Sequence, residues 1–110
     1  MCHLVFLRVN DAEMFVERIE AVLPCFADPW KIRIIAHLNS PPDLKELAEN
    51  LDARYSESLG VLLVRIGRRE ANFFSSGKVT IRMVNDVEEG KKFVNSILAM
   101  SAQKQLLKEL

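Results

Sequence analysis

Three short apolar segments separated by brief breaks in the second half of the chain constrain the fold most. Residues 59–66 and 69–74 flank Gly67-Arg68, and residues 78–84 follow Ser75-Ser76-Gly77. Glycine and serine between such runs are typical of tight turns, and connections this short join antiparallel strands. The sequence therefore predicts a three-stranded antiparallel meander. In the last strand, alternation places Val79, Ile81 and Met83 on one face and Thr80, Arg82 and Val84 on the other.

The first half of the chain predicts two strands and two helices. Residues 4–9 are mostly apolar and indicate a strand, and the helix-start pattern Asn10-Asp11-Ala12-Glu13 with helical apolar spacing predicts a helix over residues 11–23. Residues 32–38 alternate and predict a strand, which Ser40-Pro41-Pro42 ends. A short helix follows over residues 43–51, because Asp43 and Glu46 have capping-box spacing and apolar residues form one stripe.

A last helix is predicted to begin within residues 85–89, where acidic residues precede an apolar side. The helix is predicted although it contains Gly90, which is unfavourable in a helix interior. The helical pattern can continue through Leu107 to the C-terminus. Its apolar positions are Val87, Phe93, Val94, Ile97, Leu98 and Met100.

The chain of 110 residues suits one domain with its own core. Within residues 1–110 we distinguish an N-terminal strand–helix extension (1–25) from the remaining module (26–110). The apolar runs are too short to span a bilayer, and the N-terminus lacks the basic region of a secretory signal. We therefore expect a cytoplasmic protein with no membrane association.

Charge and reactive residues point away from catalysis. The net charge of zero gives no whole-chain attraction to nucleic acid, although Arg65, Arg68 and Arg69 cluster beside one turn. Cys2 and Cys25 are far apart, and with the two histidines they match no standard metal spacing. His37 has no nucleophile or carboxylate at motif spacing. We expect no enzyme activity, no catalytic residues, no cofactor and no metal.

Residues 32–98 resemble one repeat of the TATA-box-binding protein in their order of strand, helix, three-strand meander and helix. The similar segments are 34–39, 43–51, 63–66 and 74–78, of which Phe74-Ser75-Ser76-Gly77-Lys78 is the strongest match. The resemblance implies an α+β fold in which helices pack on one face of a curved antiparallel sheet. Since that family forms its saddle from two repeats, it also implies a homodimer.

The resemblance also assigns roles to individual residues. It makes Phe74 a wedge between base pairs, Asn39 a reader of the minor groove and Arg65 a phosphate contact. Leu59 stands where the family has a second wedge phenylalanine, and Arg82 where it has a threonine. An apolar wedge unstacks a base step and bends the duplex, and this same family is the best-known example of that mechanism. The residues predicted to bind nucleic acid or a partner are Asn39, Leu59, Arg65, Asn72, Phe74, Thr80 and Arg82.

The sheet face turned away from the helices mixes apolar, polar and cationic side chains, which suits a binding surface. Its predicted members are Arg33, Ile35, His37, Asn39, Asn72, Phe74, Thr80 and Arg82. The first functional hypothesis is a non-catalytic protein-interaction or assembly domain, whose partner is another protein or a second copy. The alternative is a dimeric protein that binds double-stranded DNA on its concave sheet face in transcription. A small-molecule pocket or enzyme beneath the sheet is a third possibility.

Overall fold

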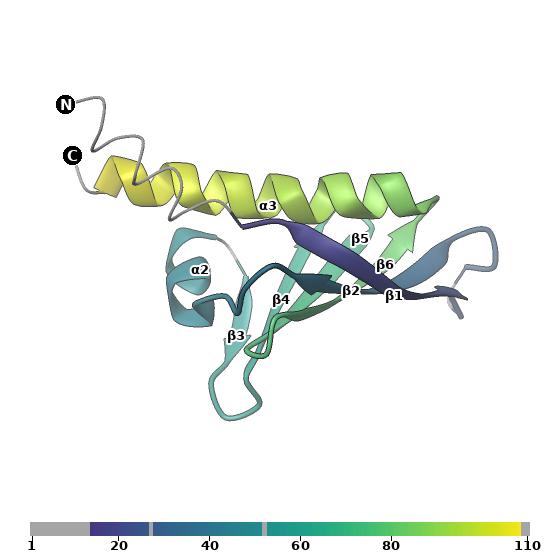
Figure 1. The fold of residues 1–110 in the computed structure, drawn as a ribbon, viewed down its shortest axis with the longest axis horizontal. Helices are drawn as coiled ribbons and strands as arrows, with labels where there is room; N and C mark the ends of the chain where they lie inside the picture. The colour runs from purple at the N-terminus through teal and green to yellow at the C-terminus, as the bar shows by residue number, and fades with distance from the viewer. Residues whose placement is uncertain (1–13, 27, 52, 109–110) are drawn as a thin grey trace.

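The part of the chain that the structure describes forms one six-stranded sheet with two helices (Figure 1). The structure is a computed structural model that describes residues 14–26, 28–51 and 53–108. The sheet has the order β1-β2-β6-β5-β4-β3, and each neighbouring pair is antiparallel, which confirms the predicted α+β class. The elements are β1 (Val16–Pro24), β2 (Ile32–Leu38), α2 (Leu44–Asn50), β3 (Arg54–Ser56), β4 (Val61–Ile66), β5 (Arg69–Phe74), β6 (Lys78–Val84) and α3 (Val87–Lys108).

The predicted meander is confirmed as β4, β5 and β6. Its two turns contain Gly67 with φ 64° and Gly77 with φ 98°. Residues with side chains rarely adopt such positive φ angles, so glycine permits both reversals without strain. The alternation over these strands buries Leu62, Ala71 and Phe73 completely.

The strand and helix predicted over residues 32–51 are also confirmed. Ile34, Ala36 and Leu38 of β2 are buried at alternate positions, as a strand requires. The Asp43 side chain then accepts a hydrogen bond from the Glu46 backbone N–H at 3.2 Å and so caps α2.

The helix predicted over residues 11–23 is wrong for its described part, which contains β1. This strand pairs with β2, where two β-bulges interrupt the alternation that would have indicated a strand. In β1 the backbone N–H and C=O groups that a helix would pair internally are instead paired with those of β2. The strand predicted over residues 4–9 and the helix start at 10–13 lie outside the described residues.

The predicted alternation is wrong at the end of β6, because Met83 does not share a face with Val79 and Ile81. Met83 has φ 65°, and the pairing register with β2 shifts beside it. Met83 is the extra residue of a β-bulge. Because of this bulge, Val84 points into the core and is fully buried, whereas Met83 is only partly buried. A positive φ angle is uncommon for a residue other than glycine, so the alternating sequence of this strand did not predict a bulge at Met83.

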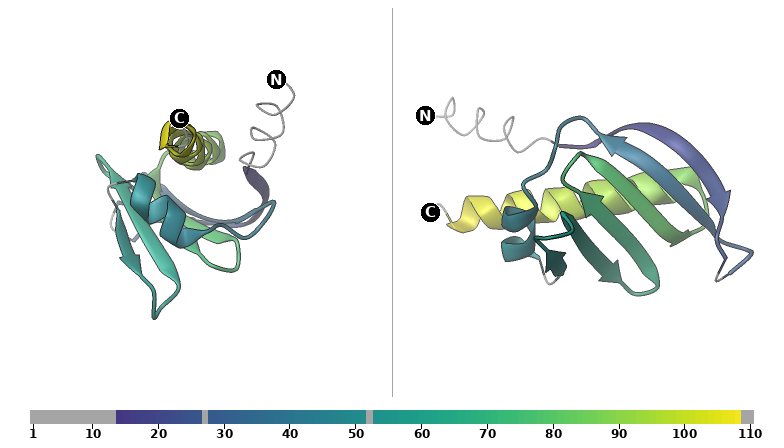
Figure 2. Two further views of the ribbon diagram at one scale, coloured as in Figure 1. Left: turned by 90° about the vertical axis from the view of Figure 1, so that its left-hand side faces the viewer. Right: turned by 90° about the horizontal axis from the view of Figure 1, so that it is seen from below.

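Helix α3 supplies the other half of the core. In the end-on view the sheet curves around α3, so the helix lies on the concave side there (Figure 2). Phe93, Val94, Ile97 and Leu98 are buried against the sheet as predicted, whereas Met100 is 38% exposed. Asp86 precedes the helix and caps it, because its carboxylate accepts a hydrogen bond from the Glu89 backbone N–H at 2.8 Å; the helix then runs from Val87 to Lys108.

Helix α2 packs beside the C-terminal half of α3 on the same side of the sheet. The link is Asn50, which is only 3% exposed and donates from Nδ2 to the Ser101 carbonyl oxygen at 3.3 Å and to Gln105 Oε1 at 3.2 Å. Both described helices therefore cover one face, and neither covers the opposite one.

Candidate binding surface

The sheet face opposite α3, called the open face from here on, carries side chains in rows across the strands. Cross-strand pairs define the first row, because residues directly opposite each other lie on the same face. This row crosses β4, β5, β6 and β2 and consists of Arg65, Glu70, Arg82 and Arg33.

The next row is uncharged. It consists of Leu63, Asn72, Thr80, Ile35 and Ala21. Within it Asn72 Nδ2 donates a hydrogen bond to Thr80 Oγ1 at 3.2 Å. Most of these side chains are half-buried by their neighbours, so the strip is ordered but accessible.

Beyond the uncharged row, Phe74 and Lys78 lie at the end of the meander. Phe74 is partly buried on the open face while Phe73 is fully buried in the core, which confirms that the two phenylalanines point to opposite faces. The Lys78 ammonium lies 6.0 Å from the centre of the Phe74 ring, within the range of a cation–π contact. His37 pairs with Lys78 from β2.

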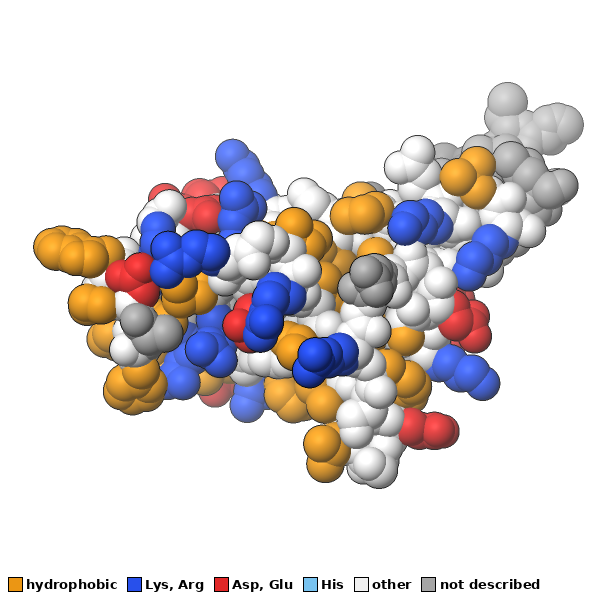
Figure 3. All heavy atoms as spheres, turned by 180° about the vertical axis from the view of Figure 1, so that it is seen from behind, with side chains coloured by type: hydrophobic (Ala, Val, Ile, Leu, Met, Phe, Trp, Pro, Cys, Tyr) orange, Lys and Arg blue, Asp and Glu red, His pale blue; other side chains and the backbone are white. Residues whose placement is uncertain are grey.

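Positive charge is concentrated on the open face although the whole chain is neutral. This face comprises the positions that cross-strand pairing places on it, together with Glu20, which contacts His37. Among them, six cations against the two carboxylates of Glu20 and Glu70 give a net charge of +4. Lys and Arg side chains are also distributed among apolar and uncharged ones in the view from behind (Figure 3). The six cations are Arg18, Arg33, Arg54, Arg65, Lys78 and Arg82.

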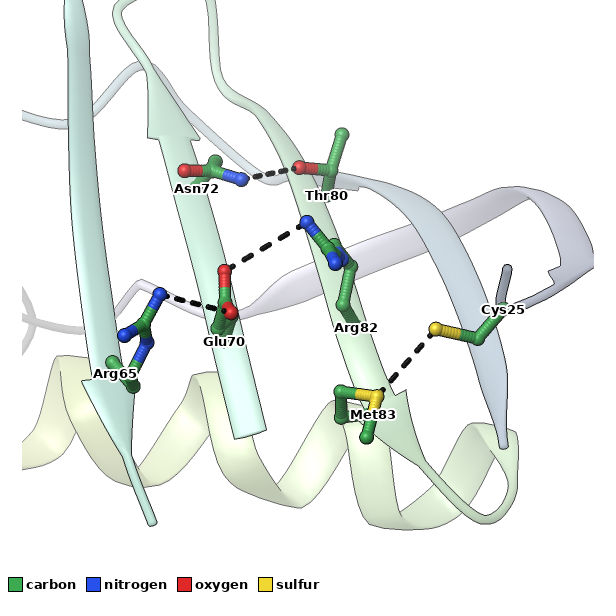
Figure 4. A network of polar contacts seen from close by, with 7 residues as sticks. All are labelled: Cys25, Arg65, Glu70, Asn72, Thr80, Arg82 and Met83. Carbon is green, nitrogen blue, oxygen red and sulfur yellow. Dashed lines mark hydrogen bonds and ion pairs between the residues drawn. The ribbon is translucent and has the colours of Figure 1, made fainter. Parts of the chain in front are cut away.

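Glu70 holds two of these arginines in place (Figure 4). Its Oε2 lies 3.2 Å from a terminal nitrogen of Arg65, and its Oε1 lies 3.9 Å from one of Arg82. The arginine side chains remain 62% and 41% exposed, so each guanidinium keeps donors directed at solvent. One carboxylate thus fixes two cations without neutralising the row.

The structure brings five of the predicted binding residues together on the open face: Arg65, Asn72, Phe74, Thr80 and Arg82. Asn39 lies just beyond β2, where its Oδ1 accepts a hydrogen bond from the Phe15 backbone N–H at 2.9 Å. Leu59 is 76% exposed in the turn before β4. These two residues therefore border the face.

Sequence reasoning missed the loop between β1 and β2. Phe26 and Trp30 in this loop are the most exposed large apolar side chains of the described chain, at 91% and 87%. The Arg33 guanidinium lies 5.5 Å from the centre of the Phe26 ring, which connects the loop to the open face. The available signal was an aromatic pair around Asp28-Pro29, a turn sequence that provides no core position.

Comparison with known protein families, curated proteins and solved structures found no match to this chain. The open face must therefore be interpreted from its own chemistry. In the described ranges no group of three or more His, Cys, Asp and Glu side chains is placed to hold a metal ion. The same residues include no helix that is both long and apolar enough to cross a bilayer.

The edge of the open face contains a titratable pair, Glu20 and His37, whose Oε1 and Nε2 atoms are 2.5 Å apart. The hydrogen bond from His37 lowers the pKa of Glu20 below its ordinary value, and the positive charges of His37, Lys78 and Arg18 act in the same direction. A carboxylate with a lowered pKa stabilises the fold above its unfolded-state pKa, and this contribution is lost as pH falls through the folded-state pKa.

We expect His37→Ala to raise the pKa of Glu20 toward its ordinary value, because the largest cause of the shift is removed. The measurement is an NMR titration of the Glu20 side-chain carboxyl carbon. An unchanged Glu20 titration would show that this hydrogen bond does not exist in solution.

Proposed function

We propose that this chain is a non-catalytic protein-interaction or assembly module that binds an acidic surface of a partner protein with its open face. The observation that carries the proposal is the net charge of +4 on one face of a neutral chain. Opposite charge on the partner would steer association and fix its orientation. The order β2, α2, β3 to β6 and α3 supports the proposed relation to one TATA-box-binding protein repeat.

The arrangement of the rows favours a protein partner. An uncharged strip containing Leu63 and Ile35 lies beside the row of Arg65, Arg82 and Arg33. Protein interfaces have this anatomy, with charge depleted at the centre and retained at the rim, and arginine is enriched in them. The +4 charge also disfavours packing of two open faces against each other, because like charges would meet.

Binding of double-stranded DNA is the second candidate, and the cations around Phe74 favour it. Lys78 contacts the Phe74 ring, and Arg65 and Arg82 lie on the same face. The concave sheet face was the predicted DNA site, but α3 lies on the concave side in Figure 2, so DNA would have to contact the open face instead. Counterion release would then make affinity fall steeply with salt.

A site-specific crosslink distinguishes these candidates. A photoreactive amino acid replaces Thr80 at the centre of the open face and, as a matched control, Lys104 on the exposed side of α3. Irradiation in the native host should yield an adduct from position 80 that protease removes and nuclease does not. A nuclease-sensitive adduct would support the DNA candidate, and no adduct specific to position 80 would contradict both.

We expect the double substitution Arg33→Glu and Arg82→Glu to abolish that adduct. It changes the net charge of the open face from +4 to zero, and loss of two interfacial charges lowers affinity about tenfold or more. The control Lys104→Glu with Lys108→Glu makes the same change in total charge on α3 and should leave the adduct intact. Equal loss in both variants would mean that only the total charge matters.

A further inference from the structure

The loop between β1 and β2 presents an aromatic knob, defined here as Phe26 and Trp30. The two side chains are 91% and 87% exposed, so almost all of their apolar surface faces water. Apolar side chains also project at this end of the molecule in the view from behind (Figure 3). Aromatic side chains bury about 150–250 Å² each when covered, which makes such a knob a candidate anchor for association.

An open groove of about 900 Å³ lies between α3 and the β4–β5 turn. Its apolar lining is Ile66, Met83, Phe93, Ile97 and Met100. Ile66 and Met100 are 49% and 38% exposed, so this floor is also accessible to a large apolar side chain. The bulge at Met83 contributes one of these apolar side chains to the groove.

The knob and the groove adjoin each other on one molecule. Asp28, between the two knob residues, lies 3.6 Å from the Arg68 guanidinium, and Arg68 lines the groove. Lys31, next to Trp30, also lines the groove and donates a hydrogen bond from Nζ to Asn85 Oδ1 at 2.6 Å. A two-fold axis close to this junction would place each knob opposite the groove of the other copy.

The charges around the groove are compatible with a second copy. The rim contains cations, such as Arg68 and Lys92, and carboxylates, such as Asp86 and Glu88. Glu88 is 73% exposed at its side chain and Arg68 is 74% exposed, so both are available to opposite charges on a partner. A rim with both signs can be complementary to itself, unlike the open face.

We propose that two copies of this chain form a two-fold dimer in which the aromatic knob of each inserts into the groove of the other. Four aromatic side chains would bury about 600–1,000 Å². The surrounding groove walls would bring the total toward the area of a stable specific interface, about 1,200 Å² or more. The two open faces remain available for the proposed partner site, apart from Arg33, whose guanidinium contacts Phe26 of the knob.

The test is sedimentation equilibrium together with the emission spectrum of Trp30, which is the only tryptophan of the chain. We expect a dimer, with emission that shifts to shorter wavelength as concentration rises and the indole leaves water. Trp30→Ala should weaken dimerisation at least about thirtyfold, the effect of losing an aromatic hot spot. Ile66→Glu, which places a charge on the groove floor, should give a monomer whose emission stays at the long wavelength of an exposed indole.

Leu107→Ala is the matched control, because Leu107 is 62% exposed near the far end of α3 and lines neither surface. It should dimerise as the wild type does. Circular dichroism of each variant confirms that it is folded. A monomeric wild type at all accessible concentrations, a dimer that survives Trp30→Ala, or a dimer whose Trp30 emission does not shift would each overturn the proposal.

Discussion

Replacing Gly90 by alanine is expected to destabilise the protein by about 1–3 kcal/mol, the usual cost of overpacking a core. Helix propensity alone predicts the opposite sign, because alanine is favoured over glycine by about 1 kcal/mol within a helix. An added Cβ would lie 2.5 Å from Ile34 Cδ1, far inside van der Waals contact. Since Ile34 is completely buried, its side chain has little room to move away.

Ile34→Val provides the decisive background for this substitution, because it deletes the Cδ1 atom with which the new Cβ would collide. Alone it should cost about 0.5–1.5 kcal/mol. In that background Gly90→Ala should become neutral or stabilising, since the other two nearest atoms, on Val84 and Ile81, remain 3.6 and 3.7 Å away. Urea denaturation of the four proteins measures this coupling. Equal losses in both backgrounds would refute the steric explanation.

Asn50→Asp is expected to cost about 3 kcal/mol or more, the loss associated with an uncompensated buried charge. Three acceptors, the Ser101 carbonyl oxygen, Ser101 Oγ and Gln105 Oε1, lie 3.2–3.3 Å from Asn50 Nδ2 and share its two N–H donors. A carboxylate has no donor and would repel the two carbonyl oxygens. Asn50→Ala, which loses the donors without adding charge, should cost only about 1–3 kcal/mol.

The pH dependence separates the charge from the lost hydrogen bonds. Burial near acceptors should raise the pKa of the introduced carboxyl in the folded state, because its neutral form can donate a hydrogen bond. The folded state then binds a proton that the unfolded state releases, so stability falls as pH rises through this interval. We expect the deficit of Asn50→Asp relative to wild type to shrink as pH is lowered, and that of Asn50→Ala to stay constant. Chemical denaturation over a pH series tests both.

Local patterns were sufficient to predict β2, α2, β4, β5, β6 and α3, but not the three-residue strand β3. Gly67 and Gly77 marked the turns of the meander, and Asp43 marked the start of α2. These signals act over a few residues, so a sequence displays them directly. Strand β1 was not predicted, because its two bulges remove the regular alternation and its partner is a separate element.

The candidate surface was predictable in outline but not in its charge. Alternation placed Asn72, Phe74, Thr80 and Arg82 on the face away from the helices. The excess of cations depends on which strands become neighbours, which brings Arg33 opposite Arg82 and Glu70 between two arginines. The groove depends similarly on the packing of α3 against a distant turn. Tertiary structure decides which strands and helices become neighbours. The total charge of zero therefore gives no sign of the local excess of cations.

The irregular β1 has a consequence for how the chain behaves at high concentration. A regular edge strand offers free backbone groups to another molecule and can nucleate intermolecular sheet growth. Here the outer edge is interrupted by two bulges, carries exposed Glu17, Arg18 and Glu20, and ends at Pro24. At the other edge β3 has only three residues. Among the described residues, the sheet therefore has no long regular border on either side to which a second sheet could anneal, which disfavours amyloid-like aggregation.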